Sequence, residues 1–196
     1  MATNLKNELT TYIKSFQILN EDEVKLIVDS SDVRAFKKGT ILVKEGDIVS
    51  NCYFILKGCI REYIIKDGVE KSTAFYIEGD SVVSFTSATN KTPSKHFQVC
   101  AEDCVLTVGN ESLENEMCEK IPRLKTIIHQ ETVKVTGQTK DDFAAFVTSS
   151  PEDRYKNLLE NKPTLLERVP LHQIASYLGV TPESLSRIRK RINGKK

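Results

Sequence analysis

The chain of 196 residues lacks a long apolar run and has no apolar core near its N-terminus. A helix that crosses a bilayer needs about 20 consecutive apolar residues, and a secretory signal needs an apolar stretch of about 7–15 residues. The first residues, MATNLKNELTTYIKSF, provide neither. We therefore expect a cytoplasmic protein with no membrane partner.

Histidine is also scarce, which restricts the kinds of enzyme that the chain could be. The three histidines are His96, His129 and His172, and only His96 falls in the strand-rich part described below. A jelly-roll metalloenzyme needs two or three histidines and a carboxylate around one metal ion. The sequence shows no Ser-His-Asp pattern or phosphate-binding loop either. We expect no enzymatic activity and no metal site.

Cysteine occurs in an odd number and without any Cys-x-x-Cys spacing. The five cysteines are Cys52, Cys59, Cys100, Cys104 and Cys118. This usage argues against a disulfide framework. Cys100 and Cys104 are near enough in sequence for a metal or redox site to be conceivable. Buried thiols that act as small apolar side chains explain the pattern better.

The distribution of charge is the first feature that indicates a partner. The formal net charge of the whole chain is +1, yet residues 168–196 alone carry +6, from seven basic residues and one glutamate. A basic tail on an acidic body suggests a polyanion as the partner of the C-terminus. A solvated charged face is the simpler alternative. The pattern of residues within the tail distinguishes between these two interpretations.

The tail segment LHQIASYLGVTPESLSRIRKRI predicts two short helices joined by a turn of about three residues. Pro170 can open the first helix, and Gly179 ends it where a left-handed backbone is needed. Thr181 is a good N-cap for the second helix, and Pro182 suits its first position. This layout is that of a helix-turn-helix, whose second helix enters the major groove of DNA.

The second helix separates an apolar stripe from a polar face. At about 100° per residue, Leu185, Ile188 and Ile192 cluster on one side, and Glu183 and Arg187 project opposite them. An arginine can bind guanine, and a glutamate can accept a hydrogen bond from cytosine. Alternatively, the two charges only form an exposed ion pair of about 0.3–0.5 kcal/mol. With double-stranded DNA as the partner, the contact residues are Thr181, Glu183, Ser184, Ser186, Arg187, Arg189, Lys190 and Arg191.

The body of the chain predicts a β-rich domain with flanking helices. Residues 3–19 have the apolar spacing of an amphipathic helix, and Asn20 with Glu23 resembles a capping box that opens another. Residues 33–108 then alternate short β-branched or aromatic runs with glycine turns. Lys66-Asp67-Gly68 separates two such runs and is a strong hairpin signal. Many short strands at this spacing indicate a β-sandwich or jelly roll.

A long helix is expected between this body and the tail. After a short acidic helix that Pro122 ends, residues 123–147 lack proline and carry the apolar edge Leu124, Ile127, Ile128 and Val135. Ser150-Pro151-Glu152 then opens the next helix. The resulting α+β architecture has a jelly-roll sensor domain (residues 1–121), a long dimerisation or linker helix (122–149) and a small, mostly helical helix-turn-helix domain (150–196).

These pieces, in this order, resemble the Crp/Fnr family of bacterial transcription regulators. The matching stretches are FKKGTILVKEGD, CYFILKGCIREYI, YIEGD and IASYLGVTPESLSRIRK, and the resemblance covers nearly the whole chain. It implies a cyclic-nucleotide-binding-type jelly roll and a homodimer that reads a two-fold symmetric operator alongside RNA polymerase. The base-reading glutamate and arginine of the family fall on Glu183 and Arg187. Pro182 replaces an arginine that the family often carries, which puts one contact in doubt.

The effector pocket departs from the members of that family that bind cyclic AMP. In those members, a Gly-Glu-Leu turn binds the ribose, and an Arg-Ser or Arg-Thr pair binds the cyclic phosphate. Here the turn after Gly79 places Ser84 at the glutamate position, followed by Phe85, and the nearest residues to the arginine pair are Lys95 and His96. A lysine supplies charge but no bidentate fork. The loss of both anchors argues against cyclic AMP.

The resemblance therefore leaves the effector open. An unidentified small molecule suits an altered pocket, and the sequence indicates no cofactor. An iron–sulfur sensor needs four clustered cysteines, and a haem sensor needs an axial ligand that His96 alone would have to supply. The alternatives are a regulator that does respond to cyclic AMP, and a ligand-binding signalling protein whose basic tail binds protein.

Overall fold

The computed structural model describes residues 2–15, 17–82 and 91–193, and these form two compact units. One unit contains residues 1–64 and 73–124, and the other contains residues 65–72 and 125–196. The second unit thus takes in the tip of a hairpin whose strands begin and end in the first unit. Among the described residues, no helix is both long enough and apolar enough to cross a membrane.

The first unit is built on two four-stranded antiparallel sheets. One sheet has the order β1-β8-β3-β6 and the other has the order β2-β7-β4-β5, so successive strands cross from one sheet to the other everywhere except between β4 and β5, which are neighbours in one sheet. This is jelly-roll connectivity, and it confirms the predicted fold of residues 33–108. The strands are β1 (Asp32–Phe36), β2 (Ile41–Val43), β3 (Cys52–Lys57), β4 (Ile60–Lys66), β5 (Val69–Tyr76), β6 (Ser81–Val82), β7 (Phe97–Cys100) and β8 (Cys104–Gly109).

The core of this unit lies between the two sheets because side chains alternate along each strand. On β3, Tyr53 and Ile55 face inward and belong to the central cluster, while Phe54 and Leu56 face the other way. The central cluster consists of Tyr53, Ile55, Ile60, Val82, Cys100, Cys104 and Leu106, each no more than 8% exposed.

The turn between β3 and β4 is unusually tight. Gly58 has φ +108°, and a Cβ added there would lie 2.6 Å from the Cys104 Sγ and 2.8 Å from the Cys104 Cα. Its backbone N–H donates a hydrogen bond to Glu78 (2.8 Å). Glycine satisfies both the positive φ and the close approach to β8, which makes it the residue that this turn requires.

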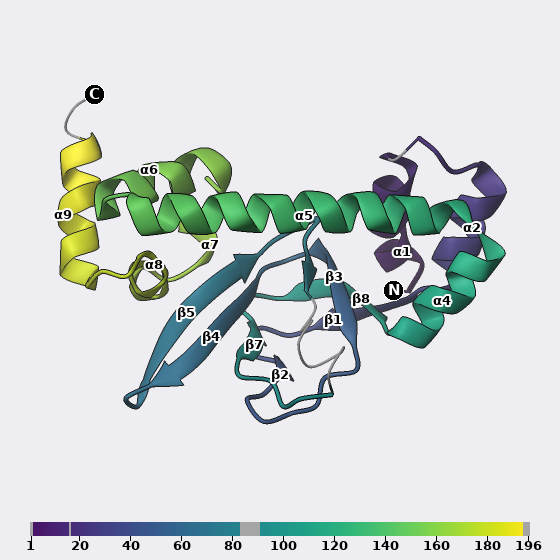
Figure 1. Cartoon of the computed structure of the whole chain (residues 1–196), viewed down its shortest axis with the longest axis horizontal. Coiled ribbons are helices and arrows are strands. Elements are labelled where there is room, and N and C mark those ends of the chain that lie inside the picture. Colours follow the sequence, from purple (N-terminus) through teal and green to yellow (C-terminus); the bar gives the residue numbers. More distant parts are fainter. Residues whose placement is uncertain (1, 16, 83–90, 194–196) are drawn as a thin grey trace. The chain divides into compact units, whose positions relative to one another are not determined.

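Two helices, α1 (Ala2–Ser15) and α2 (Glu21–Ser30), cover the outer face of the β1-β8-β3-β6 sheet (Figure 1). Leu9, Ile13 and Val24 pack there, and the rings of Tyr12 and Phe54 lie 4.3 Å apart. The capping box predicted for α2 is present: the Glu23 N–H donates to the Asn20 side chain, and the Asn20 N–H donates to the Glu23 carboxylate, each at 2.9 Å. A further helix, α4 (Glu111–Lys120), begins at the N-cap Asn110.

The predicted hairpin between β4 and β5 is also confirmed. Asp67 (φ +54°) and Gly68 (φ +73°) form its two-residue turn, and positive φ at both central positions is typical of the type I′ turn that matches strand twist. This turn lies in the part of the hairpin that belongs to the second unit.

The rest of the second unit is helical. It contains α5 (Arg123–Thr148, whose first two residues belong to the first unit), α6 (Pro151–Asn161), α7 (Leu165–Arg168), α8 (Leu171–Leu178) and α9 (Pro182–Asn193). The long helix is confirmed, and α6 begins as predicted, with the Ser150 hydroxyl accepting from the Asp153 N–H. On α5, Ile127 is buried, whereas Val133, Val135 and other apolar side chains further along are more than one third exposed.

Candidate nucleic-acid interface

The first helix of the predicted helix-turn-helix is α8, and it ends where the sequence indicated. Gly179 has φ +72°, and its N–H and that of Val180 return to carbonyl groups in the last turn of α8. A left-handed residue at this position is a standard way to close a helix. At the other end, α8 starts at Leu171, so Pro170 occupies the N-cap, one residue before the helix.

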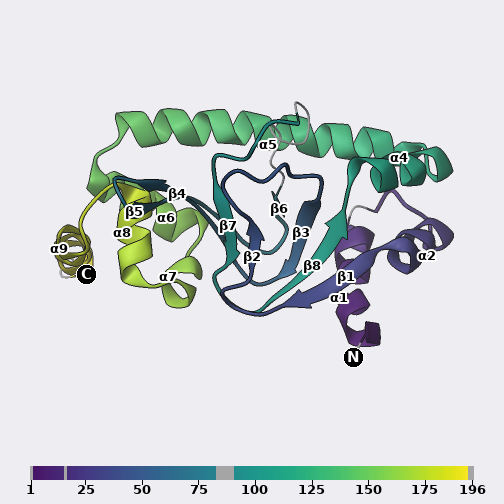
Figure 2. The same ribbon diagram turned by 90° about the horizontal axis from the view of Figure 1, so that it is seen from below.

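The second helix, α9, has the predicted N-cap. The Ser184 N–H donates to the Thr181 hydroxyl (3.2 Å), and the Leu185 N–H donates to the Thr181 carbonyl (3.0 Å). Pro182 is the first helical residue, where its missing N–H costs nothing. The two helices cross steeply, as Figures 1 and 2 show from two directions.

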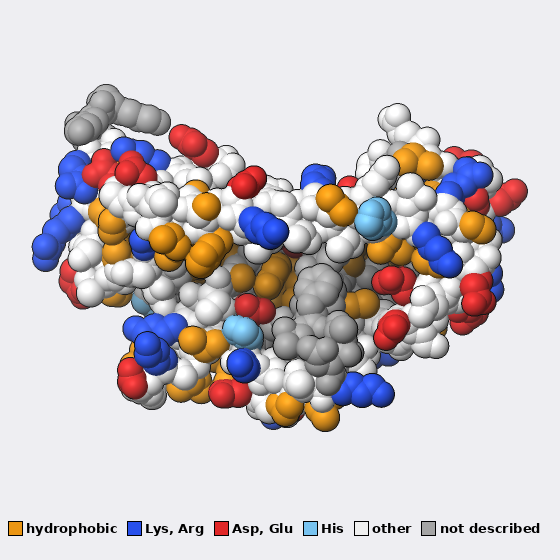
Figure 3. All heavy atoms as spheres, viewed as in Figure 1, with side chains coloured by type: hydrophobic (Ala, Val, Ile, Leu, Met, Phe, Trp, Pro, Cys, Tyr) orange, Lys and Arg blue, Asp and Glu red, His pale blue; other side chains and the backbone are white. Residues whose placement is uncertain are grey.

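Packing fixes which face of α9 points outward. Leu185 (0% exposed) and Ile188 (6%) are buried in the unit together with Ile174, Ala175 and Leu178 of α8. Of the residues expected at the DNA, Thr181, Glu183, Arg187, Lys190 and Arg191 are exposed, and Ser184, Ser186 and Arg189 are half-buried. Lys and Arg side chains gather over α9 (Figure 3). The structure thus brings all eight predicted residues onto one short helix and its cap.

The Glu183 carboxylate lies at the N-terminus of α9 and stays ionised. The pKa of Glu183 is lowered, first by a hydrogen bond from its own backbone N–H, then by the Thr181 hydroxyl, and last by the charge of Arg187. The local backbone therefore holds this carboxylate, with a smaller contribution from Arg187. An ionised Glu183 at the helix start can accept a hydrogen bond from a base.

Sequence reasoning missed Arg154 of α6, which joins three parts of the second unit. Its Nε donates to the Phe146 carbonyl (3.0 Å), and its Nη1 donates to the Leu178 carbonyl at the end of α8 (3.1 Å). Its guanidinium also lies 3.9 Å from the centre of the Phe146 ring. Arg154 therefore positions the end of α8 against α5 and α6. Arg154 and Leu178 are 24 positions apart in the sequence, so no local sequence pattern could predict this contact.

An ion pair between α6 and α9 was also missed. The Arg191 Nη2 is bonded to the Glu152 Oε2, and the Lys156 Nζ lies 3.2 Å from the Glu152 Oε1. The side chain of Glu152 is 23% exposed and that of Arg191 is 55% exposed. One of the arginines expected to bind DNA is thus paired within the protein.

The residues predicted for the effector pocket are only partly described. Ser84 and Phe85 lie outside the described residues. Gly79 is exposed in the turn after β5, where its N–H donates to the Ile55 carbonyl (2.9 Å). Lys95 is exposed and His96 is half-buried, and the His96 N–H donates to the hydroxyl of the buried Ser94 (3.2 Å).

A polar network not anticipated from the sequence lies on the inner face of the β2-β7-β4-β5 sheet. Glu62 shares a strand face with Ile60 of the core and pairs in register with Gln98. Its carboxylate accepts hydrogen bonds from the Gln98 Nε2 (3.1 Å), the Thr73 hydroxyl (3.0 Å) and the Tyr76 hydroxyl (3.4 Å). The barrel that the two sheets form therefore carries a carboxylate on its inner face, and this carboxylate accepts hydrogen bonds from neutral donors.

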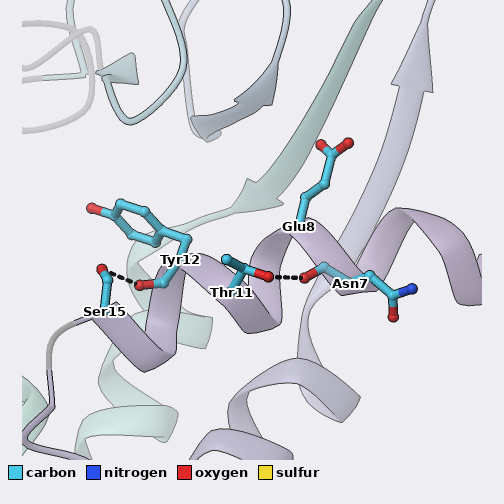
Figure 4. Close-up of a pocket in the computed structure, with 5 residues that line it drawn as sticks. All are labelled: Asn7, Glu8, Thr11, Tyr12 and Ser15. Carbon is cyan, nitrogen blue, oxygen red and sulfur yellow. Dashed lines mark hydrogen bonds between the residues drawn. The ribbon is translucent and has the colours of Figure 1, made fainter.

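A shallow hollow on α1 is a poor candidate for a ligand site. It is lined by Asn7, Glu8, Thr11, Tyr12 and Ser15 (Figure 4). The hydroxyls of Thr11 and Ser15 donate to the Asn7 and Tyr12 carbonyls of the same helix. These polar groups are thus occupied within α1 itself.

The cysteines act mainly as core residues, as expected. Cys59, Cys100, Cys104 and Cys118 are buried and Cys52 is half-buried, all as free thiols. Cys100 and Cys104 do come together: a hydrogen bond to the Cys104 side chain, assisted by burial, raises the pKa of Cys100. No group of three or more His, Cys, Asp or Glu side chains suited to a metal ion occurs within residues 2–15, 17–82 and 91–193.

Comparison with known proteins finds a family match for the strand-rich part of the chain. Residues 33–120 match the family of cyclic nucleotide-binding domains. Over 168 residues the chain is 25% identical to the anaerobic regulatory protein of Aggregatibacter actinomycetemcomitans, a match that covers 79% of this chain and 64% of that protein. The match thus spans a little under two thirds of that relative's length.

Solved structures share the fold over most of the chain. FixK2 from Bradyrhizobium japonicum has a TM-score of 0.68 at 15% identity, covering 84% of this chain and 85% of that one. The c-di-GMP responsive global regulator CLP from Xanthomonas campestris has a TM-score of 0.66 at 14% identity, covering 90% and 93%. The predicted architecture of a jelly roll, a long helix and a small helical C-terminal part is therefore confirmed.

Proposed function

We propose that the protein is a DNA-binding transcription regulator of the Crp/Fnr type. The observation that carries this proposal is the outer face of α9, where Glu183, Arg187 and Lys190 are exposed opposite a buried apolar stripe. Such a face has the shape and charge of a helix that enters the major groove. The 25% identity to a regulatory protein and the jelly-roll match support the same function.

The proposal includes a homodimer formed through α5. Val133, Val135, Phe143 and Val147 are each more than half exposed on this helix. Exposed apolar side chains along one long helix are usual where two copies pair. Two copies of α9 would then read two half-sites of a symmetric operator.

We propose that the effector, if one binds, is not cyclic AMP. Lys95 is exposed, and the inner face of the barrel carries the Glu62 carboxylate, which disfavours a second negative charge nearby. The fold is compatible with other effectors, since CLP is described as responsive to c-di-GMP. An unidentified small molecule is the remaining possibility for this pocket.

Selection from a random duplex library tests the proposed function. The full chain should enrich a two-fold symmetric sequence, and an Arg187→Ala variant that still folds should enrich it much less. Recovery of the unselected base composition by the wild-type chain would contradict DNA reading. A ligand-binding signalling protein whose basic tail contacts a protein would give that result.

A further inference from the structure

The ion pair between α6 and α9 has a geometry that bears on how the protein would bind DNA. The two carboxylate oxygens of Glu152 have different partners: Oε2 binds the Arg191 guanidinium, and Oε1 lies 3.2 Å from the Lys156 ammonium. Lys156 is one helical turn away on α6 itself, whereas Arg191 comes from the last turn of α9. The Glu152 Oε2 is thus bonded to a side chain of α9, the candidate recognition helix.

Arg191 occupies a flank of α9 rather than its centre. It follows Lys190 by one position, about 100° around the helix, and its side chain is 55% exposed. A flanking arginine suits the DNA backbone better than a base edge, because phosphates line both sides of the groove. A phosphate oxygen and the Glu152 Oε2 are both anionic acceptors, so either can accept a hydrogen bond from the same guanidinium.

We propose that Glu152 is a positioning residue for Arg191, and that its carboxylate competes with DNA phosphate for the Arg191 guanidinium. This inference rests on the proposed function. The Glu152 carboxylate occupies Arg191 in the free protein, so binding to random duplex DNA proceeds without one phosphate contact. Glu152 thereby keeps non-specific binding weak and leaves discrimination to the outward face of α9.

Salt titration of binding to a random duplex tests the inference with three variants. Glu152→Gln keeps the size of the side chain but removes the charge that holds Arg191. Glu160→Gln is the matched control, because it makes the same change on the same helix at an exposed residue near its other end. Arg191→Gln, alone and combined with Glu152→Gln, shows whether Arg191 carries the effect.

Glu152→Gln should bind the random duplex more tightly than wild type at low salt. Its plot of log affinity against log salt should be steeper by about 0.9, the slope of one added phosphate contact. The advantage should therefore shrink about 3.5-fold between 50 and 200 mM salt. Glu160→Gln should follow wild type in slope, and the double variant should return to the wild-type slope.

Two results would overturn the inference while leaving the proposed function intact. One is a wild-type slope for Glu152→Gln. The other is a slope lowered by about 0.9 for Arg191→Gln in the otherwise wild-type chain, since Arg191 would then already bind phosphate despite Glu152. The second result decides the matter even if Glu152→Gln fails to fold. Failure of the wild-type chain to bind any duplex would instead contradict the proposed function itself.

Discussion

The inner face of the barrel and the outer face of α9 differ in whether their charged side chains have partners within the protein. Inside the barrel, the Glu62 carboxylate accepts three hydrogen bonds from neighbouring side chains. On α9, Arg187 and Lys190 point into solvent. Among the described residues, no buried side-chain nitrogen or oxygen lacks a partner. The carboxylate inside the barrel therefore already has its hydrogen-bond donors, whereas the charges on α9 are exposed to another molecule.

Arg191 stands between these two cases, because it is exposed yet paired. Its guanidinium lies on the same helix as Arg187, but Glu152 of α6 holds it. Exposure alone is thus a poor guide to which cations on a surface are available to a ligand. The partners of each side chain have to be known as well.

The largest expected effect is a loss of stability that is confined to one of the two units. Leu185→Ala removes a fully buried side chain from α9 and should cost about 2–5 kcal/mol of unfolding free energy in the second unit. Hydrogen exchange followed by mass spectrometry should show lost protection in α8 and α9, with β3 and β8 unchanged. Leu106→Ala in the barrel core is the matched variant and should give the reverse pattern. Equal loss of protection in both units for either variant would contradict this prediction and show that the two units unfold together.

Ile128→Glu tests whether α5 pairs with a second copy. If the proposed dimer forms there, each copy would bury an unpaired carboxylate at a cost of about 3 kcal/mol, or more than a hundredfold in the dissociation constant. Sedimentation at tens of micromolar protein measures the shift toward monomer. Thr126→Glu, which adds one negative charge at an exposed position of the same helix, is the matched control. A wild-type chain that is already monomeric would rule out this interface.

Arg187→Ala tests whether α9 reads bases. It should weaken binding to the selected duplex by about 1–3 kcal/mol and hardly change binding to random DNA. Arg189→Ala should instead weaken both equally and reduce the salt slope by about one phosphate contact per site. Fluorescence anisotropy with both duplexes measures these differences. An equal loss on both duplexes for Arg187→Ala would mean that α9 only grips the DNA backbone.

Two N-caps offer a comparison of smaller size. Thr181→Ala and Asn20→Ala each remove a side chain that accepts a backbone N–H, so each should cost about 1 kcal/mol of unfolding free energy. Only Thr181→Ala should also weaken DNA binding, because only α9 begins there. Thermal unfolding and anisotropy on the same samples measure both. Equal DNA affinity for the two variants would show that the start of α9 does not limit recognition.

The smallest expected effect concerns the barrel. Cyclic AMP added to the full chain should give little or no heat in calorimetry, because Lys95 is exposed and the Glu62 carboxylate disfavours a second negative charge nearby. Affinity in the micromolar range or tighter would contradict this. Such a result would also show that the inner face of the barrel can bind a ligand despite the hydrogen bonds among its own side chains.

The features that the sequence predicted correctly depend on neighbours within a few residues. The capping box of Asn20 and Glu23 and the cap at Thr181 each join groups three positions apart. The left-handed Gly179 is equally local. Such geometry follows from the residue types themselves, since the chain between the groups is too short to vary.

The features that were missed join residues far apart along the chain. Glu62 and Gln98 are separated by 36 positions, and Arg154 and Leu178 by 24. Their meeting depends on how strands pair and how helices pack, which no local pattern reports. The ion pair of Glu152 and Arg191 is of the same kind. For that reason the sequence predicted the helix α9 but not the contacts that hold Arg191 of α9 and the end of α8 in place.

The tight turn at Gly58 has a consequence for how the protein tolerates genetic variation. Any other residue there would have to adopt φ near +108° and place its first carbon within 3 Å of β8, and the atoms it would meet include backbone. Repacking of a side chain could relieve only part of that clash. In a library holding all amino acids at this codon, selection for folded protein should recover glycine almost alone. At Gly39, where nothing lies within 4 Å of the added carbon, asparagine and aspartate should persist.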